Sequence, residues 1–385
     1  MMKKLPCIVA ALALALSATA STTLPLKGQL VKPNDSHIQY VGRMVTTNPD
    51  SYRFSYPGTS MTLAFEGTQL KMKAKPGSGY FMVQIDQAEP FKVAFRGERD
   101  SIATLATALP MGRHTARVMY CIEGYEYRPE FRGFILGCEG RVVDAPALSG
   151  RRMEFIGNSI TCGYGNESTN PADHFEFETE NHYYSYAQLV TRSLQAETYI
   201  VARSGIGAYR NYGGPKTGTP DWDMPSQYEY TLYADHSERW DFARFRPDVI
   251  CINLGTNDLS TNNYDTKLLK QGYKKLLGQV RSNNPQTKIV FLCGSMLNGK
   301  ELEICKSILN EVADEAHKAG DSQVYRFNFT PHDGTLKYGD IIRRAPFPDT
   351  DDASVADIIA TGLDALGGED YQATRLWWDI DKANF

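Results

Sequence analysis

The sequence predicts an all-β sandwich followed by an α/β domain that is built on a parallel sheet. The 385-residue chain is longer than one ordinary hydrophobic core requires and is long enough for two domains. Its first part is rich in short β-type segments separated by Gly and Pro, which is typical of a sandwich. In its second part apolar strand segments alternate with helical ones, which is typical of a parallel sheet covered by helices.

Residues 1–20 have the pattern of a secretory signal peptide. Lys3 and Lys4 precede a short apolar run, Ile8 to Leu16, which is followed by Ala18-Thr19-Ala20. This is a charged n-region, an h-region and an A-x-A cleavage site. The run is too short to span a bilayer, and no later stretch is long enough to do so. We therefore expect a secreted or periplasmic protein with no membrane span.

The cysteines give no indication of a metal site. Export permits disulfides, but the spacing of the six cysteines after the signal peptide implies none. Cys251 and Cys293 lie in apolar, strand-like runs, where we expect buried free thiols. Neither a CxxC pair nor a His/Cys cluster is present, so no metal and no cofactor is expected.

Residues 25–145 are predicted to form the sandwich, as a jelly roll. Ser60 to Phe65 and Tyr80 to Asp86 are rich in aromatic and β-branched residues and are bounded by pairs such as Pro57-Gly58 and Pro76-Gly77. Many short strands with this punctuation indicate an antiparallel all-β fold.

Residues 150–340 are predicted to form the α/β domain, with helices on both faces of the sheet. Five nearly continuous apolar segments indicate buried parallel strands: Arg152 to Gly157, Thr198 to Ala202, Asp248 to Leu254, Lys288 to Cys293 and Val324 to Phe329. Helices are expected between them at Tyr184 to Leu194, 266–281 and 301–319. In such sheets the site lies beyond the carboxyl ends of the strands.

Three of these strand ends carry small polar motifs. Gly157-Asn158-Ser159-Ile160-Thr161 follows the first strand, Ser204-Gly205 the second, and Gly255-Thr256-Asn257-Asp258 the third. A serine on a sharp strand-to-helix turn exposes its hydroxyl, and backbone N–H groups or an Asn amide can stabilise an oxyanion. Each motif alone is more often an ordinary turn. No GxGxxG, Walker A or Gly-x-Ser-x-Gly pattern occurs here, which disfavours nucleotide binding and the common α/β-hydrolase elbow.

The three motifs resemble the first sequence blocks of the SGNH (GDSL) hydrolases. Their wider context, with Met224-Pro225, Trp240-Asp241-Phe242 and Arg246-Pro247-Asp248, is similar to carbohydrate esterase family two, which joins an N-terminal jelly roll to an SGNH domain. The resemblance covers roughly residues 25–339 and implies a flavodoxin-like sheet. It also implies Ser159 as nucleophile, an oxyanion hole formed by the Ser159 and Gly205 amides and the Asn257 side chain, and a structural role for Asp258.

The general base that a serine nucleophile needs has no motif in this sequence. The family supplies a His after the fifth strand, in an Asp-x-x-His or Asp-Tyr/Trp-His-Pro motif. Only His332 follows that strand here, and it lacks both the acidic residue and the proline, so it is a weak candidate that is more often simply exposed. We expect His174, His182 and His236 on the surface or facing the substrate, and His317 solvated on a helix.

Residues 341–385 form an atypical tail. Asp340-Ile341-Ile342-Arg343-Arg344 can be encoded so that the same bases, read two positions later, give Tyr-His-Pro-Ser, the motif expected here. We therefore hypothesise a frameshift near Gly339. Such a product would keep the nucleophile and oxyanion hole but lose the base, and its esterase activity would be very low.

The resemblance thus implies a carbohydrate O-acetyl esterase that acts on an acetylated polysaccharide or oligosaccharide through an acyl-enzyme. The net charge of −4 argues against a nucleic-acid partner. One alternative is an inactive carbohydrate-binding protein on an esterase scaffold. Another is a lipase or thioesterase of the same fold, which is disfavoured because polar and aromatic residues such as Tyr209, Arg210, Tyr212 and Trp222 are expected to crowd the edge loops.

Overall fold

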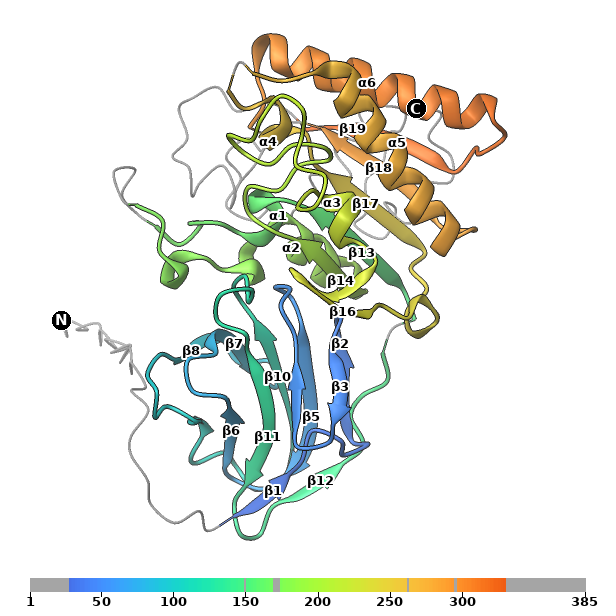
Figure 1. Cartoon of the computed structure of the whole chain (residues 1–385). Coiled ribbons are helices and arrows are strands. Elements are labelled where there is room, and N and C mark those ends of the chain that lie inside the picture. Colours follow the sequence, from blue (N-terminus) through green and yellow to red (C-terminus); the bar gives the residue numbers. More distant parts are fainter. Residues whose placement is uncertain (1–27, 149, 169–173, 262, 294–295, 330–385) are drawn as a thin grey trace, which may run out of the picture.

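A computed structural model describes residues 28–148, 150–168, 174–261, 263–293 and 296–329. The predicted signal peptide, His332 and the atypical tail lie outside these residues. Figure 1 shows the antiparallel strands of the first part in one body and the parallel sheet with its helices in a second body directly against it. Across the described ranges, every helix is too short or too polar to cross a membrane.

The first body consists of two antiparallel six-stranded sheets, which confirms the predicted sandwich. One sheet contains β1 (Gln29–Val31), β3 (Val45–Asn48), β4 (Ser51–Arg53), β6 (Leu70–Ala74), β9 (Ile102–Ala106) and β11 (Glu130–Leu136). The other contains β2 (Ile38–Val41), β5 (Ser60–Glu66), β7 (Gly79–Ile85), β8 (Phe91–Phe95), β10 (Arg113–Tyr120) and β12 (Arg141–Val143). Their inward side chains share one core, which includes Phe65, Phe81 and Phe134.

The second body is a five-stranded parallel sheet in the order β14-β13-β17-β18-β19. Its strands are β13 (Arg152–Gly157), β14 (Glu197–Ala202), β17 (Val249–Asn253), β18 (Lys288–Cys293) and β19 (Val324–Asn328). Numbered along the chain, this is the 2-1-3-4-5 order of flavodoxin-like sheets. The strands are buried almost throughout because helices cover both faces.

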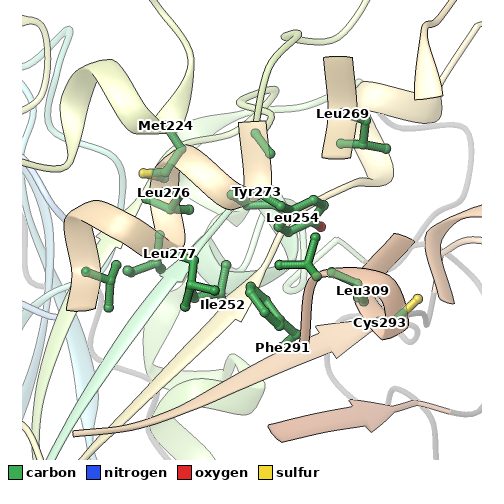
Figure 2. Packing of buried hydrophobic residues seen from close by; sticks show 14 of the residues in the cluster. Met224, Ile252, Leu254, Leu269, Tyr273, Leu276, Leu277, Phe291, Cys293 and Leu309 are labelled. Atoms are coloured by element: carbon green, nitrogen blue, oxygen red, sulfur yellow. The ribbon is translucent and has the colours of Figure 1, made fainter. Parts of the chain in front are cut away.

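The two faces of the sheet have separate cores, since alternate side chains of each strand point to opposite sides. Ile156, Ile252 and Phe291 contact α5 (Thr266–Asn283) and α6 (Gly299–Lys318) on one face, and Figure 2 shows part of this cluster. Phe155 and Cys251 contact α2 (Tyr186–Leu194) on the other. All six cysteines in the described residues are free thiols, and Cys251 and Cys293 are buried as predicted.

Several short elements were not predicted. They are α1 (Ser159–Cys162), η1 (Phe177–Thr179), η2 (His182–Tyr184), α3 (Met224–Gln227), the hairpin of β15 (Tyr230–Leu232) and β16 (Asp235–Arg239), η3 (Phe242–Arg244), and α4 (Thr256–Leu259). Elements of three to five residues do not complete enough turns or alternations to produce a periodic hydrophobic signal.

Candidate active site

The carboxyl ends of three neighbouring strands lie at the same level of the sheet. In the parallel register Gly157 of β13 pairs with Ala202 of β14 and with Asn253 of β17. The backbone N–H of Arg203 donates to the Gly157 carbonyl over 3.3 Å. The three predicted motifs therefore begin at the same level of the sheet, at its carboxyl edge, where α/β proteins place their sites.

Ser159 is the first residue of α1, directly after the end of β13 where the sequence places the candidate nucleophile. Asn158 caps this helix, since its side chain accepts from the Ile160 N–H over 3.1 Å and its carbonyl accepts from Thr161 and Cys162. Within the described residues neither the Ser159 hydroxyl nor its backbone N–H has a hydrogen-bond partner. The half-buried serine thus offers both a hydroxyl and an amide donor.

A buried polar chain fixes the Ser159 turn to the neighbouring strand. The Thr161 and Tyr186 hydroxyls are 3.0 Å apart, and the Asn253 amide donates to the Tyr186 hydroxyl over 3.4 Å. Burial raises the pKa of Tyr186 well above its usual value, so the phenol stays neutral. These bonds connect α1, α2 and the end of β17.

Gly205 has a backbone conformation that leaves its amide available. Its φ of 80° lies in the left-handed region that favours glycine. Its carbonyl accepts from the Tyr212 N–H over 2.8 Å, which fixes the peptide that follows it. Among the described residues nothing accepts from the Gly205 N–H.

Asn257 connects the third motif to the second. Its side-chain nitrogen donates to the Ile206 carbonyl over 2.8 Å, and the residue is only 7% exposed. A carboxamide nitrogen carries two hydrogens, and only one of them is used in this bond. The structure therefore joins the loops of Gly205 and Asn257 directly, and it aligns Ser159 with them through the strand register.

Asp258 is fully buried and accepts hydrogen bonds from four backbone amides. These belong to Ala208 (3.0 Å), Tyr209 (2.8 Å), Arg210 (3.1 Å) and Gly255 (3.2 Å). Burial raises the pKa of the Asp258 carboxyl, and hydrogen bonds from the amides of Tyr209, Ala208 and Arg210 oppose that shift. The carboxyl group thus holds the loop that follows Gly205 against the loop that carries Asn257, as a bracing residue would.

Two of the side chains that were expected to crowd the edge loops, those of Tyr209 and Arg210, are buried. Arg210 has no exposed surface, because its guanidinium donates to the carbonyls of Asp258, Ser260, Asn263 and Gly214. Tyr209 is 6% exposed and donates its N–H to Asp258. Tyr212 and Trp222, which were expected in the same loops, are exposed, at 67% and 54%.

The expectation for His182 was wrong. This residue is fully buried, and its Nδ1 donates to the Thr161 carbonyl over 2.7 Å. Burial lowers its pKa to about 4. A Cβ added at Gly58 of the sandwich would lie 2.9 Å from its Nε2, so the imidazole fills the interface between the two bodies.

The other described histidines have surface or sandwich positions. His174 and His236 are exposed, and His236 stacks on Tyr230. His317 is exposed on α6, and His37 and His114 lie in the sandwich, paired with Asp35 and Asp86. His332, the weak candidate base, lies outside the described residues.

Sequence analysis missed one residue at this edge, Glu123. It follows β10 of the sandwich, is 2% exposed, and accepts from the Ser204 N–H over 2.5 Å. A lone Glu-Gly pair after a strand gives no signal for this contact, which exists only because the two bodies meet here.

Both parts of the chain are similar to known protein families. Residues 40–146 match the family described as Carbohydrate esterase 2 N-terminal, and residues 155–340 match the GDSL-like Lipase/Acylhydrolase family. An acetylxylan esterase / glucomannan deacetylase of Cellvibrio japonicus is 30% identical over 293 residues, which are 71% of this chain and 77% of that protein. The cellulase/esterase CelE of Acetivibrio thermocellus is 35% identical over 303 residues, which are 79% of this chain but only 36% of that longer protein.

A solved structure extends the match to the fold. The structure of a family two carbohydrate esterase from Clostridium thermocellum, in complex with cellohexaose, has a TM-score of 0.75 and 33% identity, and covers 86% of this chain and 99% of that one. Both parts of the chain thus match one family. With its N-terminal sandwich and its GDSL-like domain, the chain belongs to carbohydrate esterase family two.

Proposed function

We propose that this protein removes acetyl groups from a polysaccharide or oligosaccharide, with Ser159 as the nucleophile. Attack of the Ser159 oxygen on the acetyl carbonyl forms a tetrahedral intermediate, release of the sugar hydroxyl leaves an acyl-enzyme, and water hydrolyses it. The Ser159 and Gly205 amides and the second N–H of Asn257 would stabilise the oxyanion. The observation that carries this proposal is that these donors lack partners in the described residues, on loops that begin at one level of the sheet.

The loop after Gly205 favours a sugar over a fatty chain. Tyr212 and Trp222 are the most exposed large aromatic side chains in the described residues. The Tyr212 N–H donates to the Gly205 carbonyl, and the Asn211 amide donates to the Trp222 carbonyl over 2.9 Å. Flat aromatic faces suit sugar rings, whereas a fatty chain requires a continuous apolar groove. Proteins similar to this chain are named acetylxylan esterase / glucomannan deacetylase, which supports acetylated plant polysaccharides as substrates.

The pattern of residues 1–20 supports secretion, and secretion would bring the enzyme to such polymers. We further propose that its turnover is low, because a frameshift near Gly339 would remove the catalytic His. The GDSL-like match ends at residue 340, next to Gly339. Resequencing the locus tests this, since it must show the Tyr-His-Pro-Ser codons in the alternative frame. Turnover at a rate normal for an esterase would instead point to His332.

The function itself is tested by acetate release from acetylated xylan and from an aryl acetate. We expect slow release by the wild-type protein, at about 10³–10⁴-fold over water if only the oxyanion hole and binding act. Any release above that residual level depends on the Ser159 hydroxyl, so Ser159→Ala should reduce release to it and leave the melting temperature unchanged. Binding to the polysaccharide with equal release by both proteins would favour the alternative of a carbohydrate-binding protein on an esterase scaffold.

A further inference from the structure

Glu123 brings a carboxyl group from the sandwich into the loops of the α/β domain. It meets Glu180, which precedes η2, and Cys162, the last residue of α1. All three residues are buried, with exposed fractions of 2% or less. A carboxyl oxygen of each glutamate and the cysteine sulfur lie within 4.8 Å of one another.

Hydrogen bonds run from this cluster to the loop that carries Gly205. The Glu180 Oε2 accepts from the backbone N–H of Glu123 over 3.1 Å. The Glu123 Oε1 in turn accepts from the Ser204 N–H over 2.5 Å. The next amide along the chain, that of Gly205, is the proposed oxyanion donor. The carboxyl group of Glu123 therefore fixes the peptide directly before that donor.

Two negative carboxylates are costly at this separation in a site without solvent. The cations that face them have other partners: Arg203 lies over the rings of Tyr125 and Tyr233, and Lys92 pairs with Glu167. The remaining titratable neighbours are neutral acids that only add to the repulsion when ionised, namely Cys121, Cys162, Tyr120, Tyr125, Tyr127, Tyr164 and Tyr233. Burial raises the pKa of both glutamates. Hydrogen bonds from Ser204 to Glu123 and from the Glu123 N–H to Glu180, and then the charges of Arg203 and Lys92, offset this only in part.

One atom of the cluster lacks a partner. The Glu180 Oε1 is buried and has no hydrogen-bond partner in the described part of the chain. A proton on one of the two carboxyl groups would turn an oxygen into a donor, remove one charge and allow an O–H···O bond between the two side chains.

We propose that Glu123 and Glu180 form a buried carboxylic acid–carboxylate pair that shares one proton, and that this pair is the positioning device for the Ser204–Gly205 loop. The sandwich thereby completes the active site. This inference rests on the proposed function only where it concerns turnover. The pair and its effect on the loop are properties of the folded chain.

The test compares Glu123→Gln and Glu123→Ala with a control, Glu178→Gln. Gln has the shape of the protonated acid, can accept from the Ser204 N–H, and can donate to Glu180 without a titrating proton. Glu178 is exposed and pairs with Arg96, so its substitution removes one charge at the surface only. The melting temperature is measured against pH, and hydrogen exchange is followed in peptides that cover 203–206.

The sign of the pH effect follows from the raised pKa values. The stability that the shared proton contributes is complete below the usual range of a glutamic acid and is lost as pH rises through the raised pKa. As the pH rises through the raised pKa, we expect the melting temperature of the wild-type protein and of Glu178→Gln to fall. The melting temperature of Glu123→Gln should fall less over the same pH range. Glu123→Ala should speed exchange at 203–206, while Glu123→Gln restores protection.

Acetate release adds a separate readout. A loop displaced by about 1 Å costs roughly 10²-fold in turnover, so Glu123→Ala should lower kcat with little change in KM, and Glu123→Gln should recover most of it. If the wild-type protein releases no acetate, the proposed function fails, while the pH and exchange measurements still decide the pair. An unchanged pH dependence in Glu123→Gln, unchanged exchange in Glu123→Ala, or a stoichiometric divalent metal in the purified protein would overturn the inference.

Discussion

The carboxamide of Asn257 donates one of its two hydrogens to the Ile206 carbonyl, and the other is the one that the proposed chemistry requires. We expect Asn257→Ala to lower kcat by about 10²–10³-fold, the usual cost of losing an oxyanion donor. Its free energy of unfolding should fall by only about 1 kcal/mol. Asn283→Ala is the control, because that side chain also makes one bond to a carbonyl, that of Gln279, on α5. Equal turnover in both variants would contradict the role of Asn257.

Asp258 has a different role from its neighbour, and stability should show this. Its buried carboxyl group accepts only from N–H donors. In Asp258→Asn an NH₂ group would face one or more of these donors and leave them without an acceptor. We expect a loss of about 2–3 kcal/mol in unfolding free energy, measured by urea denaturation. Asp221→Asn, at an exposed carboxylate, should change it by less than about 0.5 kcal/mol.

The location of Ser159, Gly205 and Asn257 at one edge of the sheet could be predicted from the sequence, because each lies within a few residues of an apolar strand and parallel strand ends share an edge. The burial of His182, Tyr209 and Arg210 could not be predicted from the sequence. Polar residues in loops are usually exposed, and only the contacts of the folded chain remove these side chains from water. The pairing of Glu123 with Ser204 depends in the same way on which surfaces of two domains meet.

At the scale of elements, α5 contacts the loop that follows Gly205 through one glycine. A Cβ on the buried Gly272 would lie 2.4 Å from the Ala208 carbonyl oxygen, whereas a Cβ on the exposed Gly278 of the same helix would meet nothing within 4 Å. Gly272→Ala should therefore cost about 1–3 kcal/mol by overpacking and also lower acetate release. Gly278→Ala should raise unfolding free energy by about 0.5–1 kcal/mol through helix propensity. If both variants gain stability, α5 does not contact the loop this closely.

The long elements were predictable for a physical reason that the short ones lack. The strands of the parallel sheet are continuous apolar runs, and α5 and α6 repeat their apolar face over several turns, so the sequence determines their positions within a few residues. The hairpin of β15 and β16 is polar on most positions. Its strands are held by pairing and by contacts such as that of the Tyr233 N–H with the Ser55 hydroxyl of the sandwich, which no local pattern reports.

At the scale of the whole molecule, a buried ion pair joins the two bodies. Arg43, between β2 and β3, has no exposed surface and donates to Glu154 of β13 over 2.9 Å. It also donates to the Tyr228 and Tyr230 carbonyls, and the Tyr228 hydroxyl donates to the second oxygen of Glu154 over 3.0 Å. The guanidinium lies over the rings of Tyr228, Trp240 and Phe242. Arg43 of the first body and Glu154 of the second neutralise each other. If either side chain were lost, the other would remain as an unpaired buried ion.

We therefore expect residues 28–329 to unfold in one cooperative transition. Arg43→Met leaves the Glu154 carboxylate buried and unpaired, which should cost about 3–5 kcal/mol, and the double variant with Glu154→Gln should lose less than Arg43→Met alone because no charge remains. Lys32→Met is the control, since the Lys32–Asp50 pair is exposed and is worth about 0–1 kcal/mol. Calorimetry with urea denaturation measures these differences. Two separate transitions in the wild-type protein would mean that the sandwich folds on its own, and the coupling through Arg43 would then be too weak to hold the two bodies as one unit.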